Sequence, residues 1–175
     1  MNTFVTFKYF DSAEGGASVY TAILHTQSVE GNAVKSEFDK FLDRYEMEEE
    51  KEPDFKEILA QIDVILTHGF ENYQLRHERE ARALPSKDRS LVSAGYMPTD
   101  GPLRLYCVLL PDNVMVLCGG GVKAEDTAQE SDGVRAHFML ANTLARKLNE
   151  RLAEETKPIS YERVEAILEK ETIYL

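Results

Sequence analysis

The sequence predicts an α+β fold in which a mainly antiparallel sheet packs with amphipathic helices in a single domain, 1–175. Two segments rich in aromatic and β-branched residues, 3–10 and 103–118, indicate strands. Stripes of apolar residues three and four positions apart in 34–68 and 134–152 indicate helices. A chain of 175 residues has the usual size of one domain with its own hydrophobic core.

The N-terminal residues 1–33 are expected to form a strand or a hairpin. Segment 3–10, TFVTFKYF, combines aromatic with β-branched residues, and the turn-forming cluster 11–16 follows it. Residues 19–26 fit the second arm of a hairpin, but their apolar residues also have helical spacing. The pattern leaves both assignments open.

Two neighbouring helices are predicted between Val34 and Gly69. The first has an apolar stripe from Val34 to Tyr45, and Asn32 or Ser36 is positioned to cap its start. Pro53 suits the first turn of the second helix, and Gly69 suits the position where that helix ends.

Two further helices are predicted toward the C-terminus. Ser131 is positioned to cap a long helix whose apolar stripe runs from Val134 to Leu152. Ser160 is positioned to start a short last helix within 158–175.

The strongest strand signal is a hairpin that follows a long loop. Residues 73–85 read as an arginine-bearing strand, and 85–102 read as a loop rich in Ser, Gly, Pro and Asp. Only Pro111-Asp112-Asn113 separates the apolar runs 103–110 and 114–118, which predicts a tight antiparallel pair.

The register expected for this hairpin brings two thiols together. With Asp112 and Asn113 as the loop, Cys107 lies opposite Cys118. The two cysteines are then either a redox pair or two small buried apolar side chains. Both faces of the hairpin are apolar, so it is expected at the centre of the sheet.

The charge distribution argues against a general nucleic-acid binder and leaves one basic region. The net charge of −11 repels nucleic acid and anionic membranes. Residues 37–57 hold four basic and ten acidic residues, whereas residues 76–123 hold seven basic and five acidic residues. The latter either face an anion or belong to a mixed solvated surface. The sequence contains neither a spanning apolar run nor a secretory signal, so we expect a cytoplasmic protein without membrane contact.

Most familiar catalytic patterns are absent from the sequence. A phosphate-binding loop needs glycine before its lysine and a hydroxyl residue after it, but Val122 and Ala124 flank Lys123. The four histidines lack metal-ligand spacing, and no serine or cysteine lies in a nucleophile-elbow context. Neither a cofactor nor a metal is therefore expected.

The remaining candidates are basic and tyrosine residues on predicted strands. Arg104 and Tyr106 share one face of a strand, and the register places Gly121 and Gly119 opposite them. This arrangement predicts an open floor beside both side chains. Cationic groups around such a floor suit a phosphodiester, with a tyrosine or a lysine orienting the attacking hydroxyl. Alternatively, Arg104 pairs with an acid and Tyr106 belongs to the core.

The order of these elements resembles the RelE/HigB/ParE toxin superfamily of bacterial toxin–antitoxin modules. A strand, two helices ending in LTHG (66–69), an arginine-bearing strand and the hairpin LRLYCVLLPDNVMVLCGGGVK (103–123) carry the resemblance. The resemblance implies a RelE-like core over about 34–152, a small twisted sheet with helices on one face. The C-terminal helix 158–175 would be an addition to it. The resemblance also implies a concave basic surface on which many members cleave messenger RNA in the ribosome without a metal.

The strand positions and the resemblance together define the expected site. The expected catalytic residues are Arg104, Lys123 and Tyr106, and the expected substrate-binding residues are Arg76, Arg79 and Arg82. The expected partners are a cognate antitoxin protein and the ribosome with its messenger RNA. The alternative function is a non-catalytic interaction domain that retains the RelE-like fold and binds a basic partner through its acidic helices. A third hypothesis is a small-molecule enzyme that uses the glycine-floored pocket.

Overall fold

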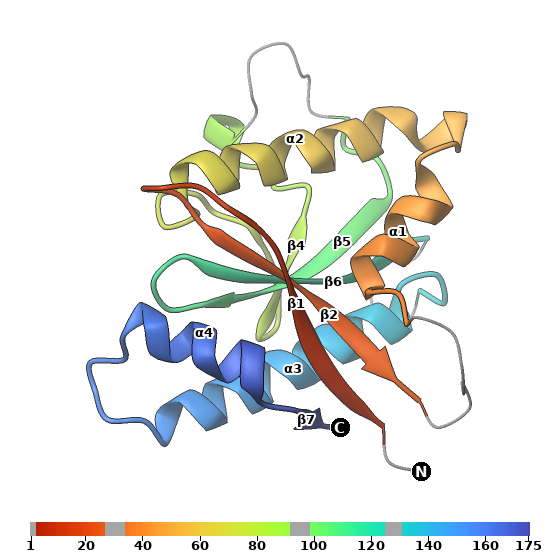
Figure 1. Cartoon of the computed structure of the whole chain (residues 1–175). Coiled ribbons are helices and arrows are strands. Elements are labelled where there is room, and N and C mark those ends of the chain that lie inside the picture. Colours follow the sequence, from red (N-terminus) through yellow and green to blue (C-terminus); the bar gives the residue numbers. More distant parts are fainter. Residues whose placement is uncertain (1–2, 27–33, 92–98, 125–130) are drawn as a thin grey trace.

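A seven-stranded sheet with helices on both faces forms the core of the chain in a computed structural model (Figure 1). The structure describes residues 3–26, 34–91, 99–124 and 131–175. The strands are Phe4–Ser12 (β1), Ser18–His25 (β2), Arg76–Glu78 (β3), Ala81–Leu84 (β4), Leu103–Leu110 (β5), Val114–Val122 (β6) and Ile173–Tyr174 (β7). The α-helices are Glu37–Tyr45 (α1), Glu52–His68 (α2), Arg135–Ala153 (α3) and Tyr161–Lys170 (α4), with short 3-10 turns at Glu49–Lys51 (η1) and Arg89–Leu91 (η2).

The predicted α+β class with a mainly antiparallel sheet is confirmed. The strand order is β3-β4-β5-β6-β2-β1-β7, and each neighbouring pair is antiparallel except β2 and β6, which run parallel. Strands from both ends of the chain share this sheet, so the predicted core of 34–152 is continuous with β1, β2 and β7.

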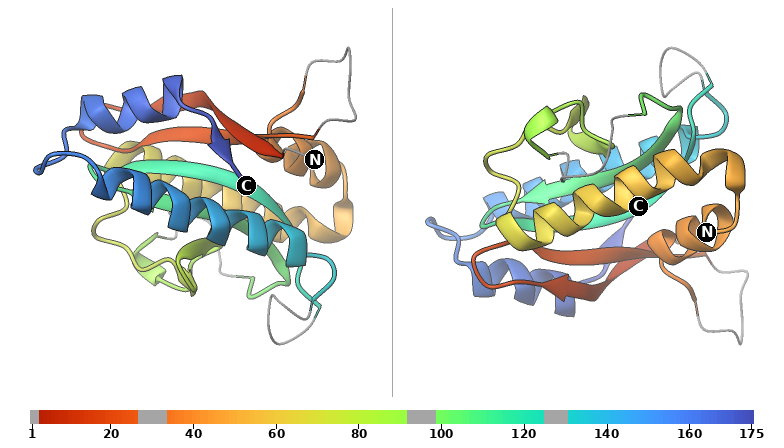
Figure 2. Two further views of the ribbon diagram at one scale, coloured as in Figure 1. Left: turned by 90° about the horizontal axis from the view of Figure 1, so that it is seen from below. Right: turned by 90° about the horizontal axis from the view of Figure 1, so that it is seen from above.

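The expectation that the helices cover one face of the sheet is wrong. Helices α1 and α2 pack on one face and α3 and α4 on the other, each pair with its own apolar cluster (Figure 2). The cause lies in the central strands, where Leu105 and Cys107 belong to the α1–α2 cluster while Tyr106 and Val108 belong to the α3–α4 cluster. A strand that is apolar on both sides needs cover on both sides.

The open assignment of residues 19–26 is resolved in favour of a strand. Strand β2 pairs antiparallel with β1 in a hairpin and also runs parallel to β6 in the middle of the sheet. Val19, Tyr20 and Ala22 are fully buried. The turn at 13–17 connects the two strands; of the predicted turn cluster 11–16, Asp11 and Ser12 instead belong to β1.

Helices α1 and α2 begin and end where the sequence predicted. The hydroxyl oxygen of Ser36 accepts a hydrogen bond from the backbone N–H of Asp39, which caps α1; the alternative cap, Asn32, lies outside the described residues. Pro53 occupies the first turn of α2. Gly69 ends that helix with a φ of 77°, a left-handed conformation that glycine adopts without strain.

The segment 73–85 forms a hairpin of two short strands, β3 and β4, where one strand was predicted. Arg79 adopts a φ of 64° in the turn between them. The side-chain oxygen of Asn142 on α3 accepts hydrogen bonds from the backbone N–H groups of Glu80 and Ala81, at 2.9 and 3.1 Å. A long-range contact with α3 therefore supports a turn that has no glycine to signal it.

The β5–β6 hairpin forms as predicted, but its register near the turn differs by one residue. Leu110 lies opposite Val114, so all three residues of Pro111-Asp112-Asn113 form the turn. Consequently Cys107 lies opposite Leu117, and the predicted pairing of Cys107 with Cys118 is wrong. Asp112 and Asn113 adopt φ angles of 59° and 56°, which short polar side chains tolerate better than most residues.

A bulge in β6 restores the predicted register at the far end of this hairpin. One residue of β5, Tyr106, faces two residues of β6, so the ladder shifts between Leu105 and Cys107. Beyond the bulge, Arg104 lies opposite Gly121, as predicted.

Both predicted C-terminal helices are present, but the cap at the start of α3 and the residues after α4 differ from the prediction. Helix α3 starts at Arg135 without a side-chain cap, because the Ser131 hydroxyl instead accepts a hydrogen bond from the backbone N–H of Ala124. Ser160 caps α4 as predicted. The predicted helix does not run to residue 175, since Ile173 turns back and pairs with Val5 as part of β7.

Candidate functional site

Three of the expected site residues lie toward the β3 edge of the sheet: Arg76 on β3, and Arg104 and Tyr106 on β5. Arg76 pairs with Ala83, and Ala83 pairs with Tyr106, so these residues share one face across β3, β4 and β5. The pKa of Arg76 is lowered, first by burial and then by the positive charge of Arg104. Two guanidinium groups therefore lie within electrostatic range of each other at this corner.

The guanidinium of Arg104 is built into the loop that leads to β5. Its Nη1 atom donates to the carbonyl oxygens of Gly101 at 2.6 Å and of Leu103 at 2.9 Å. The side chain is only 8% exposed, and its Nε has no hydrogen-bond partner among the described residues. Arg104 therefore resembles a structural residue more than one that reaches a substrate.

Tyr106 is part of the core beneath α3. It is fully buried and packs edge-to-face against Phe138, with 6.1 Å between the ring centroids. Burial raises the pKa of its hydroxyl, and the negative charge of Glu78 raises it further. The hydroxyl has no hydrogen-bond partner among the described residues. In this position the hydroxyl is not accessible to a substrate.

The glycine floor predicted beside Arg104 and Tyr106 is closed. A Cβ atom added to Gly121 would lie 2.2 Å from the carbonyl oxygen of Gly133, and one added to Gly119 would lie 2.3 Å from Nδ1 of His137. These glycines let the start of α3 and the turn before it approach β6 closely. The pocket of the small-molecule hypothesis is therefore absent at this position.

Arg79 and Arg82 lie at the β3–β4 turn, where each makes local contacts. The Arg79 guanidinium lies 5.6 Å from the centroid of the Phe138 ring, a cation–π contact. Nη1 of Arg82 donates to the carbonyl oxygen of Ala81 at 2.9 Å. Both arginines line a hollow of about 500 Å³ against α3, which they share with Arg146.

Lys123 follows β6 at the end of the hairpin where Arg104 lies. Its backbone N–H donates to the carbonyl oxygen of Pro102 at 2.8 Å, which closes the hairpin end. The side chain is half-buried. The described side-chain contacts do not link its ammonium group to Arg76 or Arg104.

A row of buried polar residues on α2, which was not predicted from the sequence, positions this corner. Asp54, Glu57 and Gln61 recur at helical spacing on the buried side of α2. Oε2 of Glu57 accepts hydrogen bonds from the backbone N–H of Thr99 at 3.0 Å and from its hydroxyl at 2.7 Å. Buried carboxylates that accept such bonds fix a loop in place. Their position within the apolar stripe of α2 was the available signal.

The partners of the row lie at both ends of the loop between β4 and β5. Oε1 of Gln61 accepts from the backbone N–H of Ser86 at 2.6 Å, and Oδ2 of Asp54 accepts from that of Leu103 at 3.3 Å. Helix α2 therefore holds both ends of this loop against the sheet, next to Arg104.

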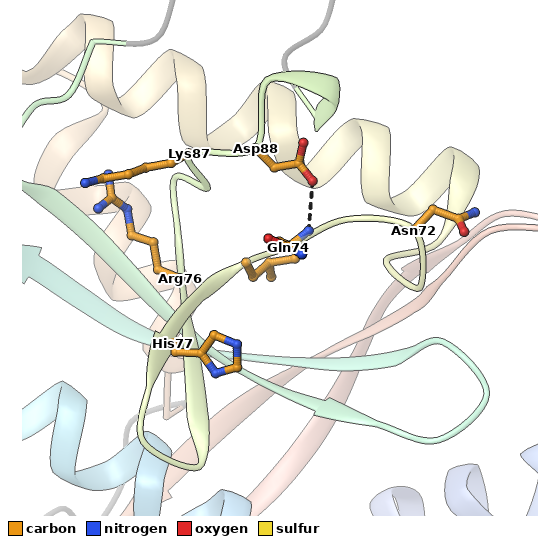
Figure 3. A pocket seen from close by; sticks show the side chains of 7 residues that line it. Asn72, Gln74, Arg76, His77, Lys87 and Asp88 are labelled. Atoms are coloured by element: carbon orange, nitrogen blue, oxygen red, sulfur yellow. Dashed lines mark hydrogen bonds between the residues drawn. The ribbon is translucent and has the colours of Figure 1, made fainter.

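An open groove of about 630 Å³ runs along β3 (Figure 3). It is lined by Asn72, Gln74, Leu75, Arg76, His77, Lys87 and Asp88. The side chains of Arg76 and Lys87 extend toward one another (Figure 3). The carboxylate of Asp88 accepts a hydrogen bond from the backbone N–H of Gln74 at 2.9 Å. The groove thus presents two cationic groups, one exposed on Lys87 and one half-buried on Arg76.

Three carboxylates act on Arg76 in the opposite sense to the positive charge of Arg104. The carboxylates of Asp100, Glu78 and Glu57 all act on the pKa of Arg76 and oppose the effect of Arg104.

Among the described residues, the expected site residues occupy three different surroundings: the β3 corner, the β3–β4 turn and the end of β6.

Comparison with known proteins gave no match at the level of a family model, a curated protein sequence or a solved structure. Within the described ranges, no group of three or more His, Cys, Asp or Glu residues is arranged to hold a metal ion. None of the described helices has both the length and the apolar character needed to span a membrane.

Proposed function

We propose that this chain is a non-catalytic protein-interaction domain with a RelE-like fold, and that its acidic helical surface binds a basic partner. One observation carries the proposal: two of the three expected catalytic residues are not on an open surface, since Tyr106 lies beneath α3 and Arg104 is held in a loop contact. A metal-independent nuclease needs such groups at the phosphate, because they must stabilise the charge that develops in the transition state.

The order of elements supports a RelE-like origin of the fold. Strand β2, helices α1 and α2, the arginine-bearing β3–β4 hairpin and the β5–β6 hairpin follow one another as the resemblance implies. The departure is the cover of α3 and α4 over the face opposite α1 and α2. That cover lies over Tyr106, one of the residues expected on an open catalytic surface.

The acidic surface lies at the corner between α1 and α2. Glu46, Glu49 and Glu50 are exposed there, and Met47 is 87% exposed among them. An exposed apolar side chain surrounded by charge is typical of an interaction surface with a small apolar centre and a polar rim. A basic partner would complement this corner.

Photo-crosslinking tests this surface. A photoactivatable residue in place of Met47 is expected to crosslink one partner, whereas the same residue in place of Met139, 58% exposed on α3, serves as the matched control. Reversing the charge at Glu49 and Glu50 should abolish the crosslink, while reversing it at the exposed Glu71 and Glu162 should leave it unchanged. Equal crosslinking from both methionine positions would contradict the proposal.

Translation in a purified ribosome assay tests the rival hypothesis of a ribosome-directed toxin with a cognate antitoxin. The unmodified chain is expected to leave messenger RNA intact and translation unchanged. Inhibition that disappears in Lys123→Ala, a variant expected to fold normally, would establish the toxin hypothesis and refute the interaction-domain proposal.

A further inference from the structure

Strand β1 leaves most of its outer side without a neighbouring strand. Strand β7 pairs with β1 only at Phe4 and Val5, so residues 6–12 have no described strand on that side. Residues 8–12 are exposed, and β1 lies toward the border of the sheet opposite β3 (Figure 2). A free edge of this length can pair with another extended strand.

The backbone of this free stretch directs hydrogen-bonding groups outward. The carbonyl oxygen of Thr3 accepts from the backbone N–H of the residue after β7 at 2.9 Å, so it points to the outer side. Backbone groups alternate between the two sides of an extended chain, and Phe7 and Tyr9 therefore direct theirs to the same outer side. The carbonyl oxygen of Lys8, which lies between them, accepts from the hydroxyl of Thr21 on β2 at 3.5 Å, as this alternation requires.

Two aromatic side chains at this edge are only half covered by their own chain. Tyr9 is 47% exposed and packs edge-to-face against Tyr20, which belongs to the α3–α4 cluster. Phe10 is 44% exposed and packs edge-to-face against Phe38, which belongs to the α1–α2 cluster. The two rings therefore flank the edge on opposite faces of the sheet, and a strand added at this edge would contact both.

A bulge in β1 brings two opposite charges onto one face of this edge. Lys8 lies opposite Thr21 of β2. Beyond the bulge at Phe10, Asp11 lies opposite Val19. Since Val19 and Thr21 are two residues apart on β2 and share a face, Lys8 and Asp11 share that face too. Both charged side chains are exposed, and neither takes part in an ion pair among the described residues.

We infer that the free edge of β1 binds the same edge of a second copy of this chain, antiparallel about a two-fold axis near Tyr9 and Phe10. A two-fold axis places residues before it on one strand beside residues after it on the other. Lys8 of each copy would then lie beside Asp11 of the other copy, and the exposed rings of both copies would meet around the axis. This inference is independent of the proposed function, which uses the corner between α1 and α2.

A second copy fits this edge better than an unrelated extended segment. An exposed lysine and a bulge on an edge strand both disfavour pairing with most other chains. Pairing here requires a carboxylate beside Lys8, a cation beside Asp11 and apolar side chains beside the two rings. The same edge in reverse order supplies all three. The charges of residues 6–12, one lysine and one aspartate, also cancel, although the whole chain carries −11.

The length of the contact predicts a weak dimer. A strand pair over residues 6–12 involves far fewer residues than the roughly 20–30 a side of a standard interface. We therefore expect a dissociation constant in the micromolar range. Analytical ultracentrifugation of the full chain from about 5 to about 500 µM should show a change from monomer to dimer.

Charge-reversal variants test the pairing itself. Lys8→Asp and Asp11→Lys should each weaken dimerisation about tenfold, since each variant places like charges side by side at two positions across the axis. An equimolar mixture of the two variants should dimerise as tightly as the unmodified chain, because opposite charges again lie side by side. Arg146→Asp, the same reversal at an exposed position of α3 near the β3–β4 turn, should leave the dissociation constant unaltered.

Three results would each overturn the inference. The first is a chain that stays monomeric over the whole concentration range. The second is a dimer that neither Lys8→Asp nor Asp11→Lys weakens while circular dichroism shows both variants folded. The third is a mixture of the two variants that associates no better than each variant alone. Any of these results with the Met47 crosslink intact would refute the β1 pairing and leave the proposed function standing.

Discussion

Nη1 of Arg104 lies 2.6 Å from the carbonyl oxygen of Gly101, and this bond ties β5 to the loop that precedes it. The same loop is held from the other side by α2, through Glu57 and Thr99. Arg104 and the buried polar residues of α2 therefore act together on one loop. The structural role of Arg104 can therefore be measured as a change in the free energy of unfolding.

Removing the Arg104 side chain is expected to destabilise the fold. In Arg104→Ala the carbonyl oxygens of Gly101 and Leu103 lose a charged donor, which should lower the free energy of unfolding by about 2–4 kcal/mol. Urea denaturation measures this change. Lys123→Ala is the control and should change the free energy by less than about 0.5 kcal/mol. Unchanged stability of Arg104→Ala would show that the guanidinium is not structural.

Close packing at Gly121 predicts a second large effect. An alanine Cβ at this position would meet the carbonyl oxygen of Gly133 at 2.2 Å, so strand β6 and the turn before α3 must separate. We expect Gly121→Ala to cost about 3 kcal/mol, as overpacking does in a dense core.

Gly15 provides the control for this glycine. It has a φ of 76° but open space around the added Cβ, so Gly15→Ala should cost only about 1–2 kcal/mol from backbone strain. Melting temperatures of both variants separate the two causes. A smaller loss for Gly121→Ala than for Gly15→Ala would contradict the packing argument.

Local patterns predicted the elements well because their causes lie close together in sequence. The cap at Ser36 and the end of α2 at Gly69 depend on residues within one helical turn. The two-sided burial of β5 was also visible as a continuous apolar run, yet the resemblance implied cover on one face only. The apolar run therefore predicted the cover on both faces correctly, whereas the resemblance did not.

The details of the site depend on contacts that no local pattern contains. The bulge opposite Tyr106 shifts the β5–β6 register between Leu105 and Cys107, and the β3–β4 turn is supported by Asn142 from a distant helix. Open space was predicted at Gly121 because the sequence gives no sign that Gly133 packs against it. Such errors arise where tertiary packing decides the geometry.

The two cysteines are expected to be inert in the folded protein. Cys107 belongs to the apolar cluster under α1 and α2, and Cys118 to the cluster under α3 and α4. Burial raises the pKa of Cys107 to about 12 and raises that of Cys118 well above its usual value, so little thiolate forms at neutral pH. Ellman's reagent should react with neither thiol until a denaturant is added. Rapid reaction of the native chain, or an intramolecular disulfide, would contradict this expectation.

An ion-pair network joins the end of α3 to α4. Arg151 forms two parallel hydrogen bonds with Glu171, at 2.7 and 2.8 Å, and also contacts Glu155 at 2.8 Å. Arg163 on α4 donates to both oxygens of Glu155. Hydrogen bonds from Arg163 and Arg151 lower the pKa of Glu155 from 4.5 to about 2.

This network predicts a pH-dependent contribution to stability. A carboxylate with a lowered pKa stabilises the fold fully above its unfolded pKa of 4.5, and the contribution is lost as pH falls toward 2. Glu155→Gln should therefore melt at a lower temperature than the unmodified chain at neutral pH, with the difference shrinking as the pH falls below 4.5. Glu150→Gln removes an exposed pair with Arg146 on the same helix and should change the melting temperature little at any pH. A difference for Glu155→Gln that stays constant from neutral pH down to about 2 would show that its carboxylate charge does not hold α4 in place.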